Sequence, residues 1–502
     1  MSDVIRILQL GTKDWSKMYQ LPQGVEWTFA EEFTATSKLL YELVFVDRML
    51  RVKEIQQLMP LTRAHTLYFV EGTDTTDSMQ HYFACRKGKY LQEGQIQDFL
   101  LNEVRNYFPN PYGEKFHMEN LAIAQGFAGT VNWDGNYCVT VEGDFGKELS
   151  QIMYWRNNIP VFKGQAIDLW LEYDKDPGVE IALTITQYRR GSISTIQQQW
   201  EFSQEELEQV VTIDNQMETG PVFVSILAKG QGRIKLVALH DRYSRRGHGV
   251  FLPGGERHAT SKKEEIFYYF DPGDMKPPLN VYFSGYKTMQ GFEGYFMMRK
   301  MGSPFLLIGE PRLSGGCFYM GDREYEKAMV DIIRKHMEEL GFSGEDVIMS
   351  GMSMGTYGAL YYGCDIRPHA MILGKPLTSI GDIAYNERLH RPGGFPTSLD
   401  MLHYLTGDAD EYAIQSLNDR FWKKFDSVDW GKSKFIVAYM IEDDYDSNSY
   451  ENLISHLKTD GVQVYGKGLH GRHNDATAAI AGWFKSQYDQ IMMDDFARRM
   501  KE

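Results

Sequence analysis

Cysteine is scarce in this sequence, and long apolar runs are missing from it. The four cysteines are spread widely over 502 residues, at Cys85, Cys138, Cys317 and Cys364. That spacing fits neither a disulfide-stabilised secreted scaffold nor a metal site built from paired cysteines. No apolar stretch approaches the roughly 18–20 residues that cross a bilayer, so we expect no integral membrane segment.

Basic residues are also fewer than acidic residues. The chain has 53 Lys and Arg against 68 Asp and Glu, which gives a net charge of −15 at pH 7. A phosphate-covered partner would be repelled on average, so no nucleic acid is expected as a ligand. Residues 1–10, MSDVIRILQL, have the pattern of an opening strand rather than of a signal peptide. We therefore expect a cytoplasmic protein with reduced thiols, and this composition is compatible with peripheral attachment at the inner face of the cell membrane.

The rhythm of apolar residues changes twice along the chain. In residues 1–115, short apolar strands alternate with helical segments such as Glu93–Phe108, which predicts a small α/β domain. Residues 116–246 read as short strands without helices, with Val222–Leu227 and Arg233–Leu239 as two separate strands. This rhythm predicts a β-sandwich of the carbohydrate-binding kind. We expect this middle domain to bind a glycan or a protein partner rather than to take part in catalysis, and its residues do not decide between those ligands.

Residues 247–502 return to an alternation of strands and helices. Apolar residues recur at helical spacing from Tyr325 to Leu340 and stop at Gly341. Strands are predicted at Asp346–Ser350, Ala370–Leu373, Phe435–Met440 and Val462–Tyr465, with a final helix from about Ala476. This alternation predicts a mainly parallel, doubly wound sheet. A segment rich in Gly, Pro and aromatics, residues 376–430, interrupts it and is predicted to form a lid.

The sharpest chemical signal is SGMSMG at residues 350–355, which follows a predicted strand and opens a predicted helix. A nucleophile on such a sharp turn leaves no room for neighbouring β-carbons, which explains why Gly351 and Gly355 flank Ser353. The turn would present the serine hydroxyl at the carboxyl end of the sheet. The Met354 amide, at the start of the helix, is a candidate donor to an oxyanion.

A nucleophilic serine needs a base, because a free hydroxyl is a weak nucleophile. In this architecture the chain order is serine, acid, histidine. The segment LHGRHND at residues 469–475 follows the last predicted strand and precedes the last helix. We favour His473 as the base because it adjoins the helix start, with His470 as the rival.

The acid is expected in the turn IEDDYD, residues 441–446, after the strand that precedes the last one. Asp443 stands at a spacing that lets the turn aim it at the histidine. Glu442 and Asp444 are close rivals. A set of this kind makes acyl transfer the expected reaction class, with a covalent acyl-enzyme that is released to water or to an acceptor hydroxyl.

Two further expectations concern donors and metals. The second oxyanion donor should come from the loop after strand Asn280–Phe283, where the amides of Gly285 and Tyr286 are the candidates. His470 and His473 are three residues apart and could share a metal ion, but no third ligand is placed near them. We therefore predict no metal site.

Three segments carry a family resemblance: the elbow SGMSMGTYGALYYG, the turn IEDDYD and the ending GLHGRHNDATAAI. With them, the C-terminal half resembles the α/β-hydrolase superfamily, so that residues 247–502 would be an α/β-hydrolase-like catalytic domain. Taken with the length, the β-rich middle and the N-terminal unit, the whole chain resembles the second of the three accessory secretory proteins of the bacterial accessory Sec system. The resemblance covers essentially the whole chain and rests most firmly on residues 279–495.

The resemblance implies an acetyltransferase that O-acetylates N-acetylglucosamine on serine-rich-repeat glycoprotein adhesins before export. It also implies a complex with the other two accessory secretory proteins and with the accessory Sec motor ATPase. The nucleophile and base carry over to Ser353 and His473, and the acid to the turn that holds Asp443. No bound cofactor is expected; the acetyl donor is a cosubstrate, for which acetyl-CoA is one candidate. The alternatives are an esterase, or a non-catalytic scaffold or chaperone-like export factor.

Overall fold

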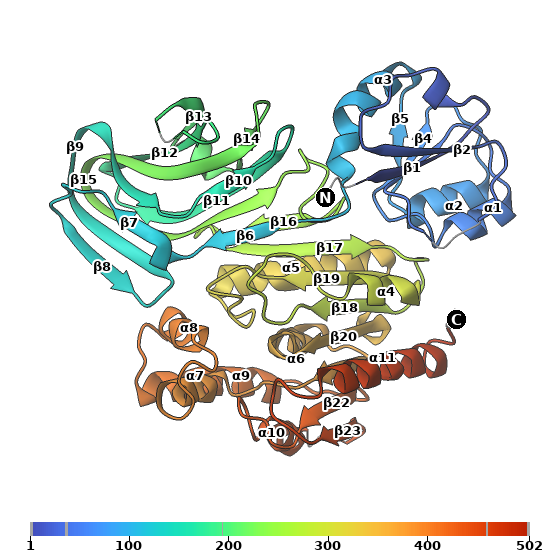
Figure 1. Cartoon of the computed structure of the whole chain (residues 1–502). Coiled ribbons are helices and arrows are strands. Elements are labelled where there is room, and N and C mark those ends of the chain that lie inside the picture. Colours follow the sequence, from blue (N-terminus) through green and yellow to red (C-terminus); the bar gives the residue numbers. More distant parts are fainter. Residues whose placement is uncertain (1–3, 36–38, 193, 458–459, 499–502) are drawn as a thin grey trace.

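The computed structural model describes residues 4–35, 39–192, 194–457 and 460–498, and the strands in these ranges form three sheets (Figure 1). The first sheet is entirely parallel, in the order β2-β1-β3-β4-β5. Its strands are β1 (Ile5–Leu10), β2 (Val25–Ala30), β3 (Leu43–Val46), β4 (Leu67–Val70) and β5 (Lys89–Leu91).

Both faces of this first sheet are covered, as a parallel sheet requires. Alternate residues of β1 enter different apolar clusters, Ile7 on one face and Leu8 on the other. Helices α1 (Val52–Leu58) and α2 (Asp77–Cys85) pack on the Leu8 face. The helical segment predicted over Glu93–Phe108 is confirmed: the chain is helical from Glu93 to Tyr107, as 3₁₀ and π turns on either side of α3 (Ile96–Asp98), and it packs on the Ile7 face.

The second sheet is an antiparallel network of ten strands that curves around its own apolar core (Figure 1). Its spine is β15 (Gly220–Tyr243), which pairs along its length with β9 (Cys138–Trp155), β11 (Ala166–Lys175) and β12 (Val179–Tyr188). The remaining strands are β6 (Gly113–Phe116), β7 (Leu121–Ile123), β8 (Thr130–Asp134), β10 (Ile159–Val161), β13 (Ile196–Ser203) and β14 (Val211–Asp214). The sheet therefore begins at Gly113, just before the predicted boundary.

The strands predicted at Val222–Leu227 and Arg233–Leu239 are both β-strand, but the turn expected between them is wrong, because they form one strand, β15. The residues between them resemble a turn in the sequence. In the fold, Gly230 and Gly232 take positive φ values of 95° and 144°, and the register with β9 shifts there. Glycine lets the strand bulge and continue rather than reverse.

The third sheet has the order β16-β17-β19-β18-β20-β21-β22-β23. The six strands from β19 to β23 in this order are parallel, and β16 and β17 add an antiparallel edge, which confirms the mainly parallel sheet. Its strands are β16 (Glu256–Ala259), β17 (Glu265–Asp271), β18 (Leu279–Phe283), β19 (Phe305–Gly309), β20 (Val347–Met352), β21 (Ala370–Gly374), β22 (Lys434–Met440) and β23 (Gln463–Leu469).

Helices cover both faces of this third sheet, as a doubly wound architecture requires. One face carries α5 (Arg323–Leu340) and α6 (Met354–Ile366), and α10 (Ser449–His456) contributes to the same core. The other carries α4 (Tyr295–Met301) and α11 (Thr477–Asp494). The helix predicted to stop at Gly341 is confirmed as α5, with Asp322 capping its start and Gly341 in the left-handed conformation at its end. Among the described residues, none of the helices is long and apolar enough to span a membrane.

The segment predicted as a lid, residues 376–430, contains three helices: α7 (Ile380–Leu389), α8 (Thr397–Thr406) and α9 (Glu411–Asp426) (Figure 1). It touches the second sheet, because Asp400 on α8 accepts a hydrogen bond of 3.1 Å from the Asn136 amide in the β8–β9 turn. The lid segment is therefore in contact with the β8–β9 turn of the second sheet.

Candidate active site

Ser353 lies on a strained turn between β20 and α6. Its φ of 51° and ψ of −124° are unfavourable for a residue with a β-carbon. The flanking glycines are a steric necessity: a β-carbon at Gly351 would lie 2.3 Å from the carbonyl carbon of Gly355, and one at Gly355 would lie 2.2 Å from the Phe283 carbonyl oxygen. The turn therefore has the geometry of a nucleophile elbow, and Ser353 itself is only partly buried.

Two long-range hydrogen bonds connect this serine to a histidine and an aspartate. Ser353 Oγ lies 2.8 Å from His473 Nε2, and His473 Nδ1 lies 2.8 Å from Asp443 Oδ2. The side chains of His473 and Asp443 are each only 3% exposed. Asp443 follows β22 and His473 follows β23, so the structure brings the three sequence-predicted residues together at the carboxyl ends of parallel strands.

The Asp443 carboxylate is held by its own loop. Its Oδ1 accepts hydrogen bonds from the backbone amides of Tyr445, at 2.9 Å, and Asp446, at 3.2 Å. The loop in turn is tied to the lid segment, because Asp446 Oδ2 accepts from the amides that begin α7, those of Thr378 and Ser379. Burial raises the pKa of Asp446, against these hydrogen bonds. Asp443 is therefore oriented toward His473 before any ligand binds.

The rival residues lie elsewhere. His470 and Glu442 form a surface pair, with His470 Nδ1 2.9 Å from Glu442 Oε1 and the histidine side chain 84% exposed. Asp444 accepts a 3.0 Å hydrogen bond from the His473 backbone amide and forms an ion pair with Arg391 of the lid segment. Neither Glu442 nor Asp444 therefore contacts the imidazole ring of His473, whose carboxylate partner is Asp443.

The expected oxyanion donors need one correction. The Gly285 amide donates a 2.8 Å hydrogen bond to Glu293 Oε2, so in this conformation it is already occupied by a carboxylate. The loop does adjoin the elbow, since a β-carbon at Gly285 would lie 3.2 Å from the Met352 carbonyl oxygen. The candidates that remain are Met354, the first residue of α6, and the amide of Tyr286.

Tyr445 and Lys375 lie at the site but were not predicted from the sequence, whereas Arg391 belongs to the segment that was predicted as a lid. The Tyr445 ring packs on the His473 ring at 4.5 Å, and the Arg391 guanidinium stacks on Tyr445 at 4.2 Å. Lys375 Nζ donates to the Asp475 carbonyl at 2.8 Å and so holds the histidine loop. Burial lowers the pKa of Lys375, while the Asp443 and Asp475 carboxylates oppose this shift. Tyr445 lies inside the acidic turn, which is the sequence signal that could have found it.

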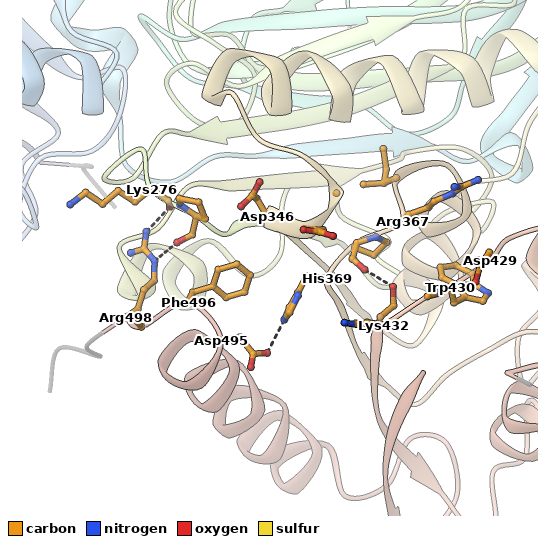
Figure 2. Close-up of a pocket in the computed structure, with 18 of the residues that line it drawn as sticks. Lys276, Asp346, Arg367, His369, Asp429, Trp430, Lys432, Asp495, Phe496 and Arg498 are labelled. Carbon is orange, nitrogen blue, oxygen red and sulfur yellow. Dashed lines mark hydrogen bonds and ion pairs between the residues drawn. The ribbon is translucent and has the colours of Figure 1, made fainter. Parts of the chain in front are cut away.

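A wide cavity of 1360 Å³ lies at the other end of the third sheet. Figure 2 shows residues from its walls, including Lys276, Arg367, His369, Trp430 and Asp495. They come from segments before the amino ends of β18, β20, β21 and β22 and from residues 495–498. Because Ser353 follows the carboxyl end of β20, this cavity is not part of the serine site.

Comparison with known proteins identifies close relatives along the whole chain. The family described as Accessory Sec system GspB-transporter matches residues 5–498. The second accessory secretory protein of the accessory Sec system in Streptococcus gordonii is 36% identical over 510 residues, covering 99% of this chain and 100% of that protein. Its counterpart in Staphylococcus aureus strain NCTC 8325 / PS 47 is 36% identical over 511 residues, covering 98% and 97%.

One solved structure is similar over the same length. A chain of the Glycosylation Associate Protein (Gap123) complex from Streptococcus agalactiae superimposes with a TM-score of 0.87 at 34% identity. The match covers 99% of both chains. The arrangement of the three sheets is therefore shared with that protein.

Proposed function

The chain belongs to the accessory Sec system GspB-transporter family, and on that premise we propose that it is an O-acyltransferase that works through an acyl-serine at Ser353. The observation that carries the proposal is the continuous hydrogen-bonded series from Ser353 through His473 to Asp443, placed on a strained strand-to-helix turn. A serine, a histidine and a carboxylate in these positions are what nucleophilic acyl transfer requires.

The proposed reaction has two halves. In the first, His473 Nε2 takes the proton from Ser353 Oγ as that oxygen attacks the acyl carbonyl, and the amides of Met354 and Tyr286 stabilise the oxyanion. The imidazolium then gives the proton to the departing donor group, which leaves acyl-Ser353. In the second half, His473 takes the proton of the acceptor hydroxyl as its oxygen attacks the acyl-serine, and returns that proton to Ser353 Oγ.

We propose an acetyl group as the acyl group and a hydroxyl of N-acetylglucosamine on a serine-rich-repeat glycoprotein as the acceptor. The family resemblance supports this substrate class, and the donor remains an acetyl carrier such as acetyl-CoA. If water replaces the sugar in the second half-reaction, the same site is an esterase. The partial exposure of Ser353 supports access by an acceptor on a large substrate.

The direct test of the nucleophile is covalent labelling. A fluorophosphonate should modify the wild-type protein, and peptide mapping should place the label on Ser353. Ser350 is the matched internal control, because it belongs to the same motif but is fully buried and donates its hydroxyl to the Val281 carbonyl. A folded protein that resists labelling, or that is labelled elsewhere, would contradict the proposal.

The acid is tested by three isosteric changes. Asp443→Asn should lower ester turnover by at least about 10²-fold, because the asparagine amide would donate to His473 Nδ1 and leave the wrong tautomer facing Ser353. Glu442→Gln and Asp444→Asn should cost less, since neither contacts the imidazole. Steady-state turnover of an activated ester measures all three. A larger loss for either neighbour than for Asp443 would reassign the acid.

We further propose that the protein works in a complex with the other two accessory secretory proteins. The support is the similar chain from Streptococcus agalactiae, which was solved as part of a complex. The accessory Sec motor ATPase and the glycosylated adhesin are proposed as further partners from the family resemblance. With these partners, we propose that the protein acts at the inner face of the cell membrane.

A further inference from the structure

The loop between β18 and α4, residues 284–294, reaches from the elbow to the second sheet, and we call it the oxyanion loop. Gln290 makes its contacts with that sheet. The Gln290 amide donates to the Gly113 carbonyl at 2.8 Å, and its side-chain oxygen accepts from Arg242 Nε at 2.7 Å. Its side-chain nitrogen lies 2.6 Å from His240 Nδ1. One residue of the loop is thus bonded to both β6 and β15.

These anchors are themselves fixed. His240 is fully buried, which lowers its pKa well below the usual value and leaves a neutral ring whose Nδ1 can accept a hydrogen bond from the Gln290 amide group. Arg242 is also buried, and its guanidinium holds both carboxylate oxygens of Glu265 on β17. A bidentate, buried ion pair gives the arginine one geometry. Gln290 therefore binds to a rigid part of the molecule.

The other end of the oxyanion loop is held within the third sheet. Gly285 donates to Glu293 Oε2, while the Glu293 amide donates to Ser284 Oγ at 3.2 Å. The Tyr319 hydroxyl donates to the Ser284 carbonyl at 2.5 Å. Between these two attachments, Tyr286 is 39% exposed and Met289 is also exposed, so packing alone does not fix the segment.

We infer that the second sheet positions the oxyanion loop through Gln290, and that Gln290 and Glu293 are positioning residues for the acyl-transfer site. The inference rests on the proposed function. The hydrogen bonds of Gln290 set the far end of the loop, those of Glu293 set the near end, and the Tyr286 amide lies between them. The middle of the chain then supports the geometry of the acyl-transfer site in addition to any ligand that it binds.

The second loop beside the elbow has the same kind of support. Lys115, on β6, donates to the Pro311 carbonyl at 3.1 Å. The loop it holds continues to Gly315 and Gly316, where an added β-carbon would lie 2.3 Å from the Tyr286 ring and 2.4 Å from the Met354 side chain respectively. Burial lowers the pKa of Lys115, and the Glu172 carboxylate opposes this shift. Two loops that flank Ser353 therefore depend on residues of β6 and β15.

The test compares Gln290→Ala with Thr288→Ala in the full chain. Thr288 is the matched control, an exposed residue of the same loop. For Gln290→Ala we expect faster hydrogen exchange across residues 284–294 and a fall in kcat for an activated ester of about tenfold to a hundredfold, since misplacing an oxyanion donor costs that much. KM should stay within about twofold, because ground-state binding does not use the oxyanion donors. Thr288→Ala should behave as wild type.

A second pair keeps the inference testable if Gln290→Ala does not fold. Glu293→Gln retains an oxygen that accepts from the Gly285 amide and should keep kcat within about threefold, whereas Glu293→Ala should lose about tenfold or more. Equal activity of these two variants would overturn the inference. So would a Gln290→Ala protein with a lower melting temperature but unchanged kcat.

Failure of the proposed function gives a different result. The rate of hydrogen exchange in residues 284–294 reports whether the oxyanion loop is held in place, and this measurement does not depend on enzymatic turnover. Unchanged exchange in Gln290→Ala overturns the inference even if the wild type is active. Faster exchange in that variant, with no ester turnover and no serine labelling in the wild type, overturns the proposed function but supports the attachment of the loop to the second sheet.

Discussion

Replacing His473 by alanine should lower acyl transfer by on the order of 10³-fold or more. The Nε2 atom that lies 2.8 Å from Ser353 Oγ is the group that would accept the serine proton. Without it the hydroxyl stays protonated during attack. The fold should survive, because the Asp443 carboxylate keeps the hydrogen bonds from the amides of Tyr445 and Asp446 after the imidazole is gone. Ester turnover and transfer to a glycosylated acceptor both measure the loss.

His470→Ala is the matched control for this prediction. The two histidines share one loop, but the side chain of His470 is 84% exposed and pairs with Glu442. Its removal should change turnover by no more than about twofold, as surface substitutions usually do. If the ranking is reversed, the base is His470 with Glu442 as its acid. Two mild effects, in proteins that melt as the wild type does, would remove the triad altogether.

The sequence was sufficient for the elbow and for the order of the site residues. A serine between glycines after a strand has few alternative explanations, and the structure gives its steric reason in the contacts of Gly351 and Gly355. Parallel strands end at the same edge of a sheet, so residues after β20, β22 and β23 had to meet there. Strand order alone therefore brought Ser353, Asp443 and His473 together.

The choice among three adjacent carboxylates could not be made in this way. Sequence spacing does not show which side chain among residues 442–444 faces the histidine, because that depends on hydrogen bonds to backbone amides within the turn. Asp443 is selected because its Oδ1 accepts from two amides of its own loop, which leaves Oδ2 for His473. The occupation of the Gly285 amide by Glu293 was equally invisible, because an irregular loop has no periodicity to read.

Contacts between the sheets were the hardest features to predict from the sequence. Gln290 stands about fifty residues from its partners Arg242 and His240, in a segment that reads as an ordinary loop. The assignment of residues 116–246 to ligand binding followed from strand rhythm alone, which says nothing of what the strands touch. When one sheet packs against a site on another, its contribution to that site depends on a few buried side chains, and strand periodicity does not identify them.

Ser353→Ala should abolish sugar acetylation while leaving the complex with the other accessory secretory proteins, and much of the adhesin export, in place. The substitution removes one oxygen atom and the hydrogen bond to His473. The backbone bond from the Ser353 amide to the Gly374 carbonyl, at 2.8 Å, stays. Alanine at this φ is no more strained than serine, so packing should hardly change. Intact-mass analysis of the glycosylated adhesin from cells carrying each version should show the loss of acetyl groups.

The physical reason for expecting separable functions is the difference in the surfaces involved. The proposed acyl transfer would use a few atoms at the carboxyl ends of β20, β22 and β23, whereas a stable complex needs on the order of 800 Å² of surface from each partner. Two of the three sheets do not contain these strands. Co-purification with both partners and measurement of secreted adhesin test this directly. If a Ser353→Ala protein with an unchanged circular dichroism spectrum and melting temperature loses its partners and blocks export as fully as a deletion does, the two functions are one, and the enzymatic step itself gates secretion.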